Sequence, residues 1–242
     1  MKKILITGSA DGLGQLAAIE LVKQGHEVIL HARNESRAKE ALAKVPGAKT
    51  ALSGDLSDME QTKRLADKVN RLGPFDAIIH NAGVYQKPAQ TILTVNTIAP
   101  YILTCLTESS KRLIYLSSGD HLNGDPTLSR LRANPPNARY SDSKLHDLIL
   151  AKAVAKKWPN VFSNALDPGW VATKMGGAGA PDDLQKGYET QVWLAVSDDP
   201  GALVSGKYFH HQREASYQLK ADDENIQEGF LHLCEKISGV KF

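Results

Sequence analysis

The sequence is poor in cysteine, methionine and aromatic residues, and it carries no strong charge of either sign. Its 242 residues include two cysteines, three methionines and 6% aromatic residues, and the formal net charge at pH 7 is +2. Cys105 and Cys234 stand far apart without a CxxC spacing, so we expect neither a disulfide framework nor a metal site. Free thiols are typical of a reducing compartment, and we therefore expect a cytoplasmic protein.

Two further absences bear on partners. The sequence has no run of five like charges, and its near-neutral balance gives no reason to expect nucleic acid or an anionic membrane as a partner. No apolar run approaches the ~20 residues of a membrane span. The chain enters an apolar strand at residues 4–6, too short for a signal peptide. We expect a protein that acts on a small molecule.

Short apolar segments alternate with longer segments of helical period. The predicted strands are residues 4–6, 28–30, 49–52, 77–79, 113–116, 161–166 and 206–209. The predicted helices are residues 13–24, 35–44, 59–72, 91–106, 141–157, 184–196 and 223–237. This alternation predicts an α/β fold with a single doubly wound, Rossmann-like parallel sheet and helices on both faces. We expect one domain over residues 1–242, with substrate loops at about 119–139 and 174–187.

A glycine-rich segment, Thr7–Gly14, lies between the first predicted strand and the first predicted helix. Its G-x-x-x-G-x-G spacing lets the backbone turn tightly and approach a pyrophosphate, which the free N–H groups of the following helix can bind. A tight turn without a ligand is the alternative. The residues assigned here to cofactor binding are Gly8, Ser9, Asp11, Gly12, Leu13 and Gly14.

The end of the second predicted strand bears on the choice of cofactor. An acidic residue usually holds the ribose 2′-hydroxyl here, but this chain has Ala32 followed by Arg33. Arg33 can neutralise a 2′-phosphate, and Arg37, one helical turn later, can assist. We therefore favour NADP(H) over NAD(H), although Asp11 nearby does not help to bind a phosphate. A solvated surface arginine is the alternative.

Two more strand ends carry candidate cofactor residues. Asp55 and Leu56 follow the third predicted strand and are placed to meet the adenine ring. Asn81, Ala82 and Gly83 follow the fourth strand, where small residues let the backbone pass close to a cofactor. Either segment is alternatively a simple turn.

Tyr140 and Lys144 are the candidate acid/base pair. They stand four residues apart at the start of a predicted helix, so both lie on one helix face. A phenol has a reference pKa of about 10, and a neighbouring ammonium lowers the pKa toward the working range of a general acid/base. The spacing alone is common by chance, so the pair gains weight only from its neighbours.

Those neighbours end the flanking strands. Ser117-Ser118 stands at the carboxyl edge of a strand, where one hydroxyl can donate to a substrate carbonyl oxygen. Pro168-Gly169 is expected to turn the chain around a nicotinamide, and Thr173 to hold a carboxamide or a phosphate. Asn96 lies in mid-helix, where its side chain is unfavourable unless it has a role. In the segment after residue 167, Pro168, Gly169, Val171 and Thr173 are assigned to cofactor binding.

In their order along the chain, these motifs resemble the short-chain dehydrogenase/reductase family. The matching residues are Thr7–Gly14, Asp55, Asn81-Ala82-Gly83, Asn96, Ser118, Tyr140-x-x-x-Lys144 and Pro168-Gly169. The resemblance implies a catalytic tetrad of Asn96, Ser118, Tyr140 and Lys144, with Ser118 rather than Ser117 matching the family serine. It implies that the tyrosine protonates a carbonyl oxygen while the nicotinamide supplies hydride. It also implies that the lysine lowers the tyrosine pKa and binds the ribose hydroxyls, and that the asparagine holds a water.

A further likeness is to the retinol-dehydrogenase-like branch. It is carried by Tyr140–Leu145, Pro168–Val171, Gly206–Phe209 and the Ala-Arg-Asn after the second strand. The likeness implies NADP(H) as cofactor and a lipophilic aldehyde or alcohol as substrate. A homo-oligomer is compatible with the family, but the segment from Asn96 to Ser117 is short where many members dimerise.

Other interpretations compete with a reductase. A nucleotide-sugar epimerase or dehydratase uses the same Tyr-x-x-x-Lys pair, but such chains are usually longer than this one. A non-catalytic NADP(H)-sensing protein usually loses the tyrosine or the lysine, and both stand here. His121 is either a substrate contact or a surface residue. His210-His211 does not predict a metal site, because no further candidate ligand stands at a spacing typical of metal sites.

Overall fold

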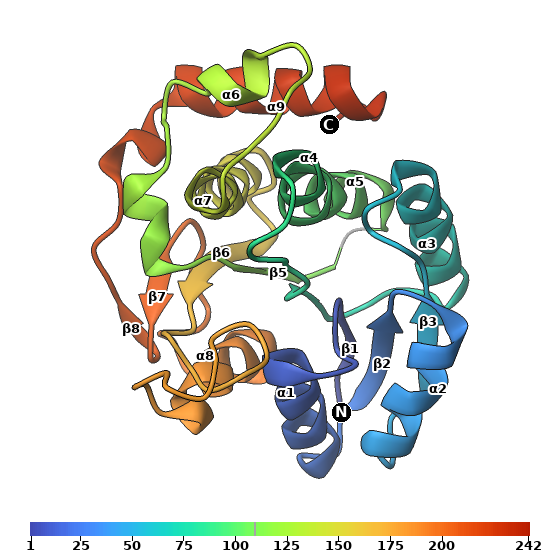
Figure 1. The fold of residues 1–242 in the computed structure, drawn as a ribbon. Helices are drawn as coiled ribbons and strands as arrows, with labels where there is room; N and C mark the ends of the chain where they lie inside the picture. The colour runs from blue at the N-terminus through green and yellow to red at the C-terminus, as the bar shows by residue number, and fades with distance from the viewer. Residues whose placement is uncertain (109) are drawn as a thin grey trace.

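The computed structural model describes residues 1–108 and 110–242. Within these ranges, eight strands form one sheet in the order β3-β2-β1-β4-β5-β6-β7-β8 (Figure 1). All neighbouring strands pair in parallel except β7 and β8, which are antiparallel. The strands are β1 Lys3–Ile6, β2 Glu27–Ala32, β3 Thr50–Ser53, β4 Ala77–His80, β5 Arg112–Leu116, β6 Phe162–Asp167, β7 Tyr208–His210 and β8 Arg213–Glu214. The predicted doubly wound sheet is therefore confirmed.

Helices cover both faces of this sheet, as Figure 1 shows. The α-helices are α1 Gly12–Lys23, α2 Glu35–Lys44, α3 Met59–Arg71, α4 Ala89–Ile92, α5 Ala99–Leu106, α6 Ser129–Arg132, α7 Tyr140–Lys157, α8 Leu184–Val196 and α9 Glu224–Ser238. The other helical segments are the π-helix η1 Leu93–Ile98 and the 3₁₀ turns η2 Gly119–Asn123 and η3 Leu219–Asp222. Helices α1, α2 and α8 lie on one face, and α3, α5 and α7 lie on the other, with α9 packed outside α7.

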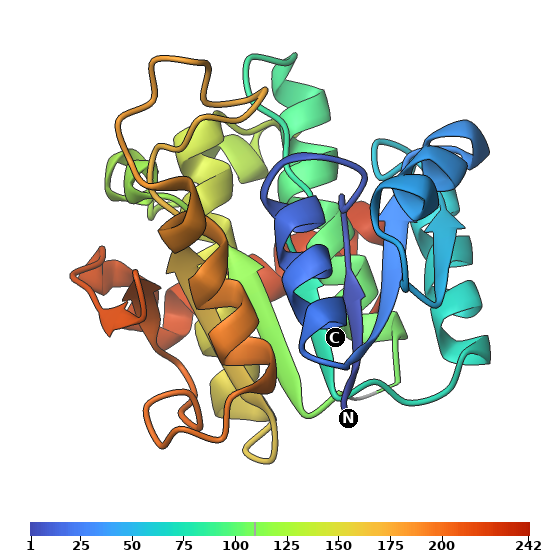
Figure 2. The same cartoon turned by 90° about the horizontal axis from the view of Figure 1, so that it is seen from below.

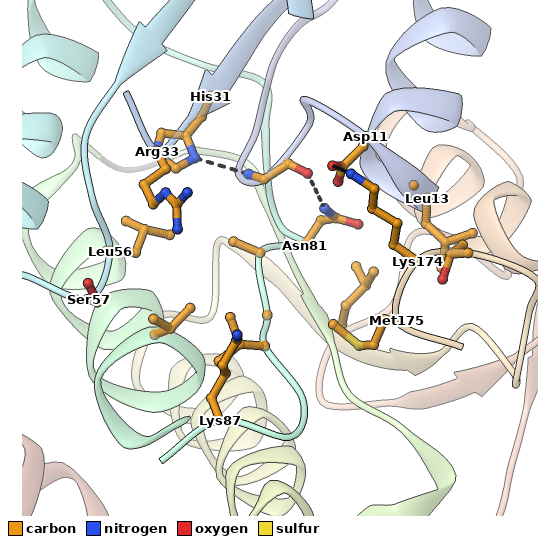
Figure 3. Close-up of a pocket in the computed structure, with 18 of the residues that line it drawn as sticks. Asp11, Leu13, His31, Arg33, Leu56, Ser57, Asn81, Lys87, Lys174 and Met175 are labelled. Carbon is orange, nitrogen blue, oxygen red and sulfur yellow. Dashed lines mark hydrogen bonds and ion pairs between the residues drawn. The ribbon is translucent and has the colours of Figure 1, made fainter. Parts of the chain in front are cut away.

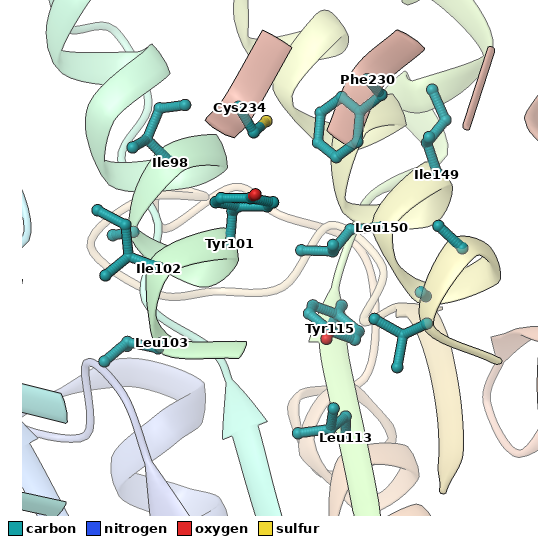
Figure 4. Packing of buried hydrophobic residues seen from close by; sticks show 14 of the residues in the cluster. Ile98, Tyr101, Ile102, Leu103, Leu113, Tyr115, Ile149, Leu150, Phe230 and Cys234 are labelled. Atoms are coloured by element: carbon teal, nitrogen blue, oxygen red, sulfur yellow. The ribbon is translucent and has the colours of Figure 1, made fainter. Parts of the chain in front are cut away.

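The alternation of side chains along β1 explains why two separate cores form. Ile4 and Ile6 point to the core beneath α1, α2 and α8, whereas Leu5 points to the core beneath α3, α5 and α7. The second core is the larger, and it extends outward to α9. There Phe230 and Cys234 pack over Tyr101 and Ile149 (Figure 4). Strands buried on both faces need continuous apolar runs, which is why the sequence signalled them clearly.

The helix predicted for residues 91–106 is longer than expected and is not regular. It runs from Ala89 to Leu106, and its middle, η1, is a π-helix in which the N–H of Ala99 reaches the carbonyl of Thr94. Pro100 gives the physical reason, because proline has no N–H to donate and its ring crowds the carbonyl four residues earlier. That carbonyl belongs to Asn96, so the irregular turn contains one of the candidate site residues.

Among the described helices, Ala89–Leu106 is long and apolar enough to cross a membrane, although the sequence showed no unbroken apolar run of that length. Most of it is buried inside the protein, where α5 packs on α3 and η1 packs on α7. A core helix of this kind meets the same criteria of length and composition.

Short elements account for most other differences from the prediction. The predicted loop 119–139 contains η2 and α6, and the predicted loop 174–187 overlaps the start of α8 at Leu184. Strand β8 and the turn η3 were not predicted. Elements of two to five residues carry too little periodicity to be recognised from sequence.

Candidate active site

A cleft opens at the carboxyl edge of the sheet, where the strand order reverses between β1 and β4. Figure 2 shows the loops after β1, β4 and β6 at this one edge. The cleft has a volume of about 410 Å³. In open α/β sheets ligands bind at this switch point. The predicted site residues that line the cleft are Gly8, Asp11, Gly12, Leu13, Arg33, Asp55, Leu56, Asn81, Ala82, Gly83, Tyr140, Lys144, Pro168 and Thr173.

Asn81 holds the glycine-rich loop in place. The Asn81 amide donates to the carbonyl oxygens of Thr7 at 2.9 Å and of Gly8 at 3.1 Å (Figure 3). A Cβ atom at position 14 would lie 2.4 Å from Asn81 Nδ2 and 2.8 Å from the Gly8 oxygen. The third glycine of the motif is therefore required for the close packing of α1 on this loop.

His31 is a part of the site that the sequence did not reveal. The Gly8 N–H donates to His31 Nδ1 at 3.0 Å, and His31 Nε2 lies 2.9 Å from the carbonyl oxygen of Gly54. The ring is thus neutral, with its proton on Nε2, and burial lowers the pKa of His31 to about 4. It connects the glycine-rich loop to the end of β3. A polar residue inside an apolar strand was the only signal for it.

Four predicted cofactor residues do not belong to the lining of the cleft: Ser9, Gly14, Gly169 and Val171. Ser9 is fully buried; its hydroxyl donates to the Ile6 oxygen at 3.0 Å and accepts from the His31 N–H at 2.9 Å. The buried Val171 packs toward Gly187. The side chains of Ser9 and Val171 therefore shape the loops around the cleft from inside the fold.

Cationic side chains gather at the cleft. Arg33, Lys87 and Lys174 all line it (Figure 3). The expected assistance from Arg37 does not fit this arrangement, because its guanidinium pairs with Asp11 at 2.8 Å and with Glu40 at 2.5 Å. Arg33 is exposed and lies on the cleft wall, so it is the arginine available to a ligand.

Tyr140 begins α7 at the floor of the cleft. The carboxylate of Asp142 accepts from the Arg139 N–H at 2.9 Å and so stabilises the first turn of the helix. Burial raises the pKa of Tyr140, whereas the Lys144 ammonium and the Ser118 hydroxyl act to lower it. The net shift of the pKa is upward, opposite to the expected direction, because burial disfavours the phenolate more than these neighbours stabilise it.

Lys144 is buried one turn further along α7, with Nζ 5.6 Å from the centroid of the Tyr140 ring. Its ammonium donates to the Leu116 carbonyl oxygen at 2.6 Å and to Asp147 Oδ2 at 2.9 Å. Burial acts to lower the pKa of Lys144, but Asp147 and Tyr140 reverse this effect and the pKa is raised. The sequence did not indicate the partner Asp147.

The two serines at the end of β5 have different surroundings. The Ser117 hydroxyl donates to the Lys144 carbonyl oxygen at 2.7 Å, so its proton is used within the fold. Ser118 accepts from the Asp120 N–H at 3.2 Å and lies close enough to Tyr140 to lower the pKa of the phenol. Ser117, rather than the predicted Ser118, belongs to the lining of the cleft, but of the two hydroxyls that of Ser118 does not donate to a backbone carbonyl.

Asn96 lies outside the lining of the cleft and connects two segments that border it. Its amide oxygen accepts from the Val84 N–H at 2.8 Å, and its amide nitrogen donates to the Val84 oxygen at 3.0 Å and to Ser143 Oγ at 3.0 Å. The loop after β4 is thereby tied to α7 beside Lys144. His121 is likewise buried and bonded, with Nδ1 2.7 Å from the Ser118 oxygen and Nε2 accepting from the Gln218 N–H.

Comparison with known proteins agrees with this arrangement. The family model for short chain dehydrogenases matches residues 2–183. An uncharacterized oxidoreductase of Emericella nidulans is 44% identical, covering 99% of this chain and 98% of its own length. The short-chain dehydrogenase chyC of Penicillium rubens is 41% identical, covering 100% of this chain and 99% of its own.

More distant relatives match over nearly the whole chain. Human retinol dehydrogenase 14 is 26% identical over 99% of this chain and 87% of its own length. A crystal structure of an uncharacterized protein from Mycobacterium paratuberculosis superposes with a TM-score of 0.84 at 22% identity, covering 100% of this chain and 95% of that one. The chain therefore belongs to the short-chain dehydrogenase/reductase family, whose members are oxidoreductases that interconvert alcohols and carbonyl compounds with NAD(P).

Proposed function

We propose that the protein reduces an aldehyde or ketone, or oxidises the corresponding alcohol, with NADP(H) as cofactor and Tyr140 as the general acid/base. The observation that carries this proposal is that Tyr140 and Lys144 line the same cleft as the glycine-rich loop and Arg33. The substrate is a small molecule, and the two free cysteines favour a cytoplasmic location.

The residues at the head of α1 fit a dinucleotide. The Asp11 side chain makes no capping hydrogen bond to α1, which leaves N–H groups of the first turn available to a pyrophosphate. Gly14 lets α1 pack closely against Gly8 and Asn81, and Gly8 and Gly12 line the cleft, where their backbone can approach phosphate oxygens. Leu56, Val84 and Val95 supply apolar surface for an adenine ring on the other side of the cleft.

The bound cofactor supplies hydride to the carbonyl carbon or accepts it from the alcohol. In the reductive direction Tyr140 donates its phenolic proton to the carbonyl oxygen, and Ser118 donates a hydrogen bond to the same oxygen. Lys144 binds ribose hydroxyls, and its charge stabilises the phenolate that remains on Tyr140. Asn96 keeps the loop after β4 in place, so that Gly83 stays within contact of Lys144.

The decisive experiment is turnover of NADPH with a panel of aldehydes and ketones, from small polar to long apolar compounds. Tyr140→Phe removes the transferable proton and should lower kcat by at least about a hundredfold, as loss of a general acid does, while the NADPH dissociation constant is retained. Unchanged turnover in Tyr140→Phe would exclude this acid/base assignment. A sensor that only binds NADP(H) would show no turnover in either form.

Arg33 is the residue proposed to select NADP(H). Arg33→Ala should raise KM for NADPH about tenfold or more, because a charged hydrogen bond contributes about 1.5–3 kcal/mol, and leave KM for NADH unchanged. Arg71→Ala is the control, because this exposed arginine ends α3 and does not belong to the lining of the cleft. If the wild type uses NADH as well as NADPH, the role given to Arg33 is wrong.

A further inference from the structure

A buried carboxylate on α7 has no part in the proposed chemistry. Asp147 lies one turn beyond Lys144, and the two side chains are only 5% and 6% exposed. Their charged atoms, Asp147 Oδ2 and Lys144 Nζ, are 2.9 Å apart. Acidic residues are almost never fully buried unless they are paired, so the position of Asp147 depends on this ammonium.

The same contact determines where the Lys144 ammonium sits. An ammonium has three N–H donors, and two of them are occupied by Asp147 Oδ2 and by the Leu116 oxygen at 2.6 Å. Both acceptors are supplied by rigid elements, α7 and the end of β5. Nζ also lies 3.7 Å from the place where a Cβ on Gly83 would stand, which brings it to the wall of the cleft. One N–H remains for a ligand there.

Other ionisable groups surround this pair on several elements. Tyr140 is on the same helix, Tyr115 is on β5, Asp167 ends β6, and Asp120 lies in η2. Asp167 also favours the charged form of Lys144, but in the described part of the chain the hydrogen-bonded carboxylate is that of Asp147. Without it, Lys144 would be a buried cation beside neutral phenols and more distant acids, which favours loss of its proton.

We propose that Asp147 is a positioning residue that holds the Lys144 ammonium charged and in place at the wall of the cleft. This inference rests on the role proposed for Lys144 and extends it to a residue that does not itself line the cleft. Asp147 acts through Lys144, and removing its charge therefore weakens proton retention at both Lys144 and Tyr140.

Asp147→Asn tests this while keeping the shape of the side chain. Carbonyl reduction needs a proton on Tyr140 and a charge on Lys144, and loss of a neighbouring negative charge lowers the pKa of both groups. The alkaline limb of kcat/KM for reduction should therefore move to lower pH in this variant. A limb that stays at the wild-type pH, or moves to higher pH, overturns the proposal.

The control is a second ion pair, in which the lysine lies on α7 and the carboxylate on η3. Lys152 is 7% exposed and pairs with Asp222 at 2.6 Å, but it lies far along α7 from Tyr140. Asp222→Asn removes a carboxylate from a buried lysine without touching the cleft. Its alkaline limb should coincide with that of the wild type, whereas an equal shift in both variants would assign the effect to stability and overturn the proposal.

A measurement without cofactor or turnover separates this inference from the proposed function. The side-chain ammonium signal of Lys144 in nitrogen NMR, assigned by its loss in Lys144→Met, should titrate at lower pH in Asp147→Asn than in the wild type. Coincident midpoints overturn the inference even if carbonyl reduction is found. If no carbonyl compound is reduced, the proposed function fails and this titration still decides the role of Asp147.

If Asp147→Asn does not fold, a second variant tests the same proposal. Burial raises the pKa of Asp147 to about 6 against the opposing effect of Lys144. Lys144→Met removes that opposition, so the carboxyl signal of Asp147 should titrate at higher pH than in the wild type. An unchanged Asp147 midpoint shows that the pair is not coupled and overturns the proposal.

Discussion

Replacing Asn96 by alanine tests whether this residue acts mainly by holding the backbone around the cleft. Its side chain is 1% exposed and makes three hydrogen bonds, two to Val84 and one to Ser143. Asn96→Ala removes all three and leaves both backbone groups of Val84 without that partner. The loop after β4 then loses its link to α7.

The expected cost follows from these contacts. A hydrogen bond within a folded protein contributes about 1 kcal/mol net, so three of them predict a loss of about 3 kcal/mol in the free energy of unfolding. Val84 is only half-buried, so water can reach its freed groups and the cost should not rise far above this value. A loss of about 3 kcal/mol is a large part of the stability of a typical domain.

Urea unfolding followed by circular dichroism measures this loss as a lower midpoint at an unchanged slope. Asn137→Ala is the control, because that amide makes a single side-chain hydrogen bond, to Pro135 at 3.3 Å; its effect should stay within about 0.5 kcal/mol. If Asn96→Ala is also within about 0.5 kcal/mol of the wild type, the three hydrogen bonds do not hold the loop and the reasoning is refuted.

Two further predictions concern cofactor binding and acid stability. Gly14→Ala places a Cβ 2.4 Å from Asn81 Nδ2, so the NADPH dissociation constant measured by fluorescence should rise about tenfold or more. Gly179→Ala is the control, because a Cβ there has no atom within 4 Å and the constant should stay unchanged. Equal constants in the two variants would contradict this prediction. Burial holds three histidines neutral in the folded state, with pKa values of about 4, 3 and 4 for His31, His80 and His146. The unfolded chain binds these protons below about pH 6.5, so the stabilisation is fully present above that pH. It is lost progressively down to about pH 4 for His31 and His146 and to about pH 3 for His80, at up to about 1.4 kcal/mol per pH unit for each histidine. Urea unfolding at several pH values should show this fall, with a shallower slope in His146→Gln, and a free energy of unfolding that is constant between pH 7 and 5 would disprove it.

The parallel sheet and the location of the cleft could be predicted from the sequence for a definite physical reason. Parallel strands buried on both faces must be apolar throughout, so β1, β4 and β5 stand out as short unbroken runs. The carboxyl ends of such strands meet at one edge, so the sequence predicts that Gly8 and Asn81, which follow β1 and β4, lie close together; both line the cleft.

The partners of the site residues were decided only by the tertiary structure. His31 holds Gly8 from 23 residues away, and Asn96 bonds to Ser143 across 47 residues. Asp147 is only three residues from Lys144, but this spacing alone does not indicate that both side chains are buried. The π turn around Asn96 likewise depends on the place of Pro100 within a packed helix.

Local sequence thus determined which groups reach the edge of the sheet, because strand period and glycine spacing are properties of short segments. Packing decided their charge and orientation, because burial and hydrogen-bond partners come from elements that are distant along the chain. Tyr140 shows the difference: its place beside Lys144 was evident from four-residue spacing, whereas the upward shift of its pKa arises from burial that only the folded chain creates.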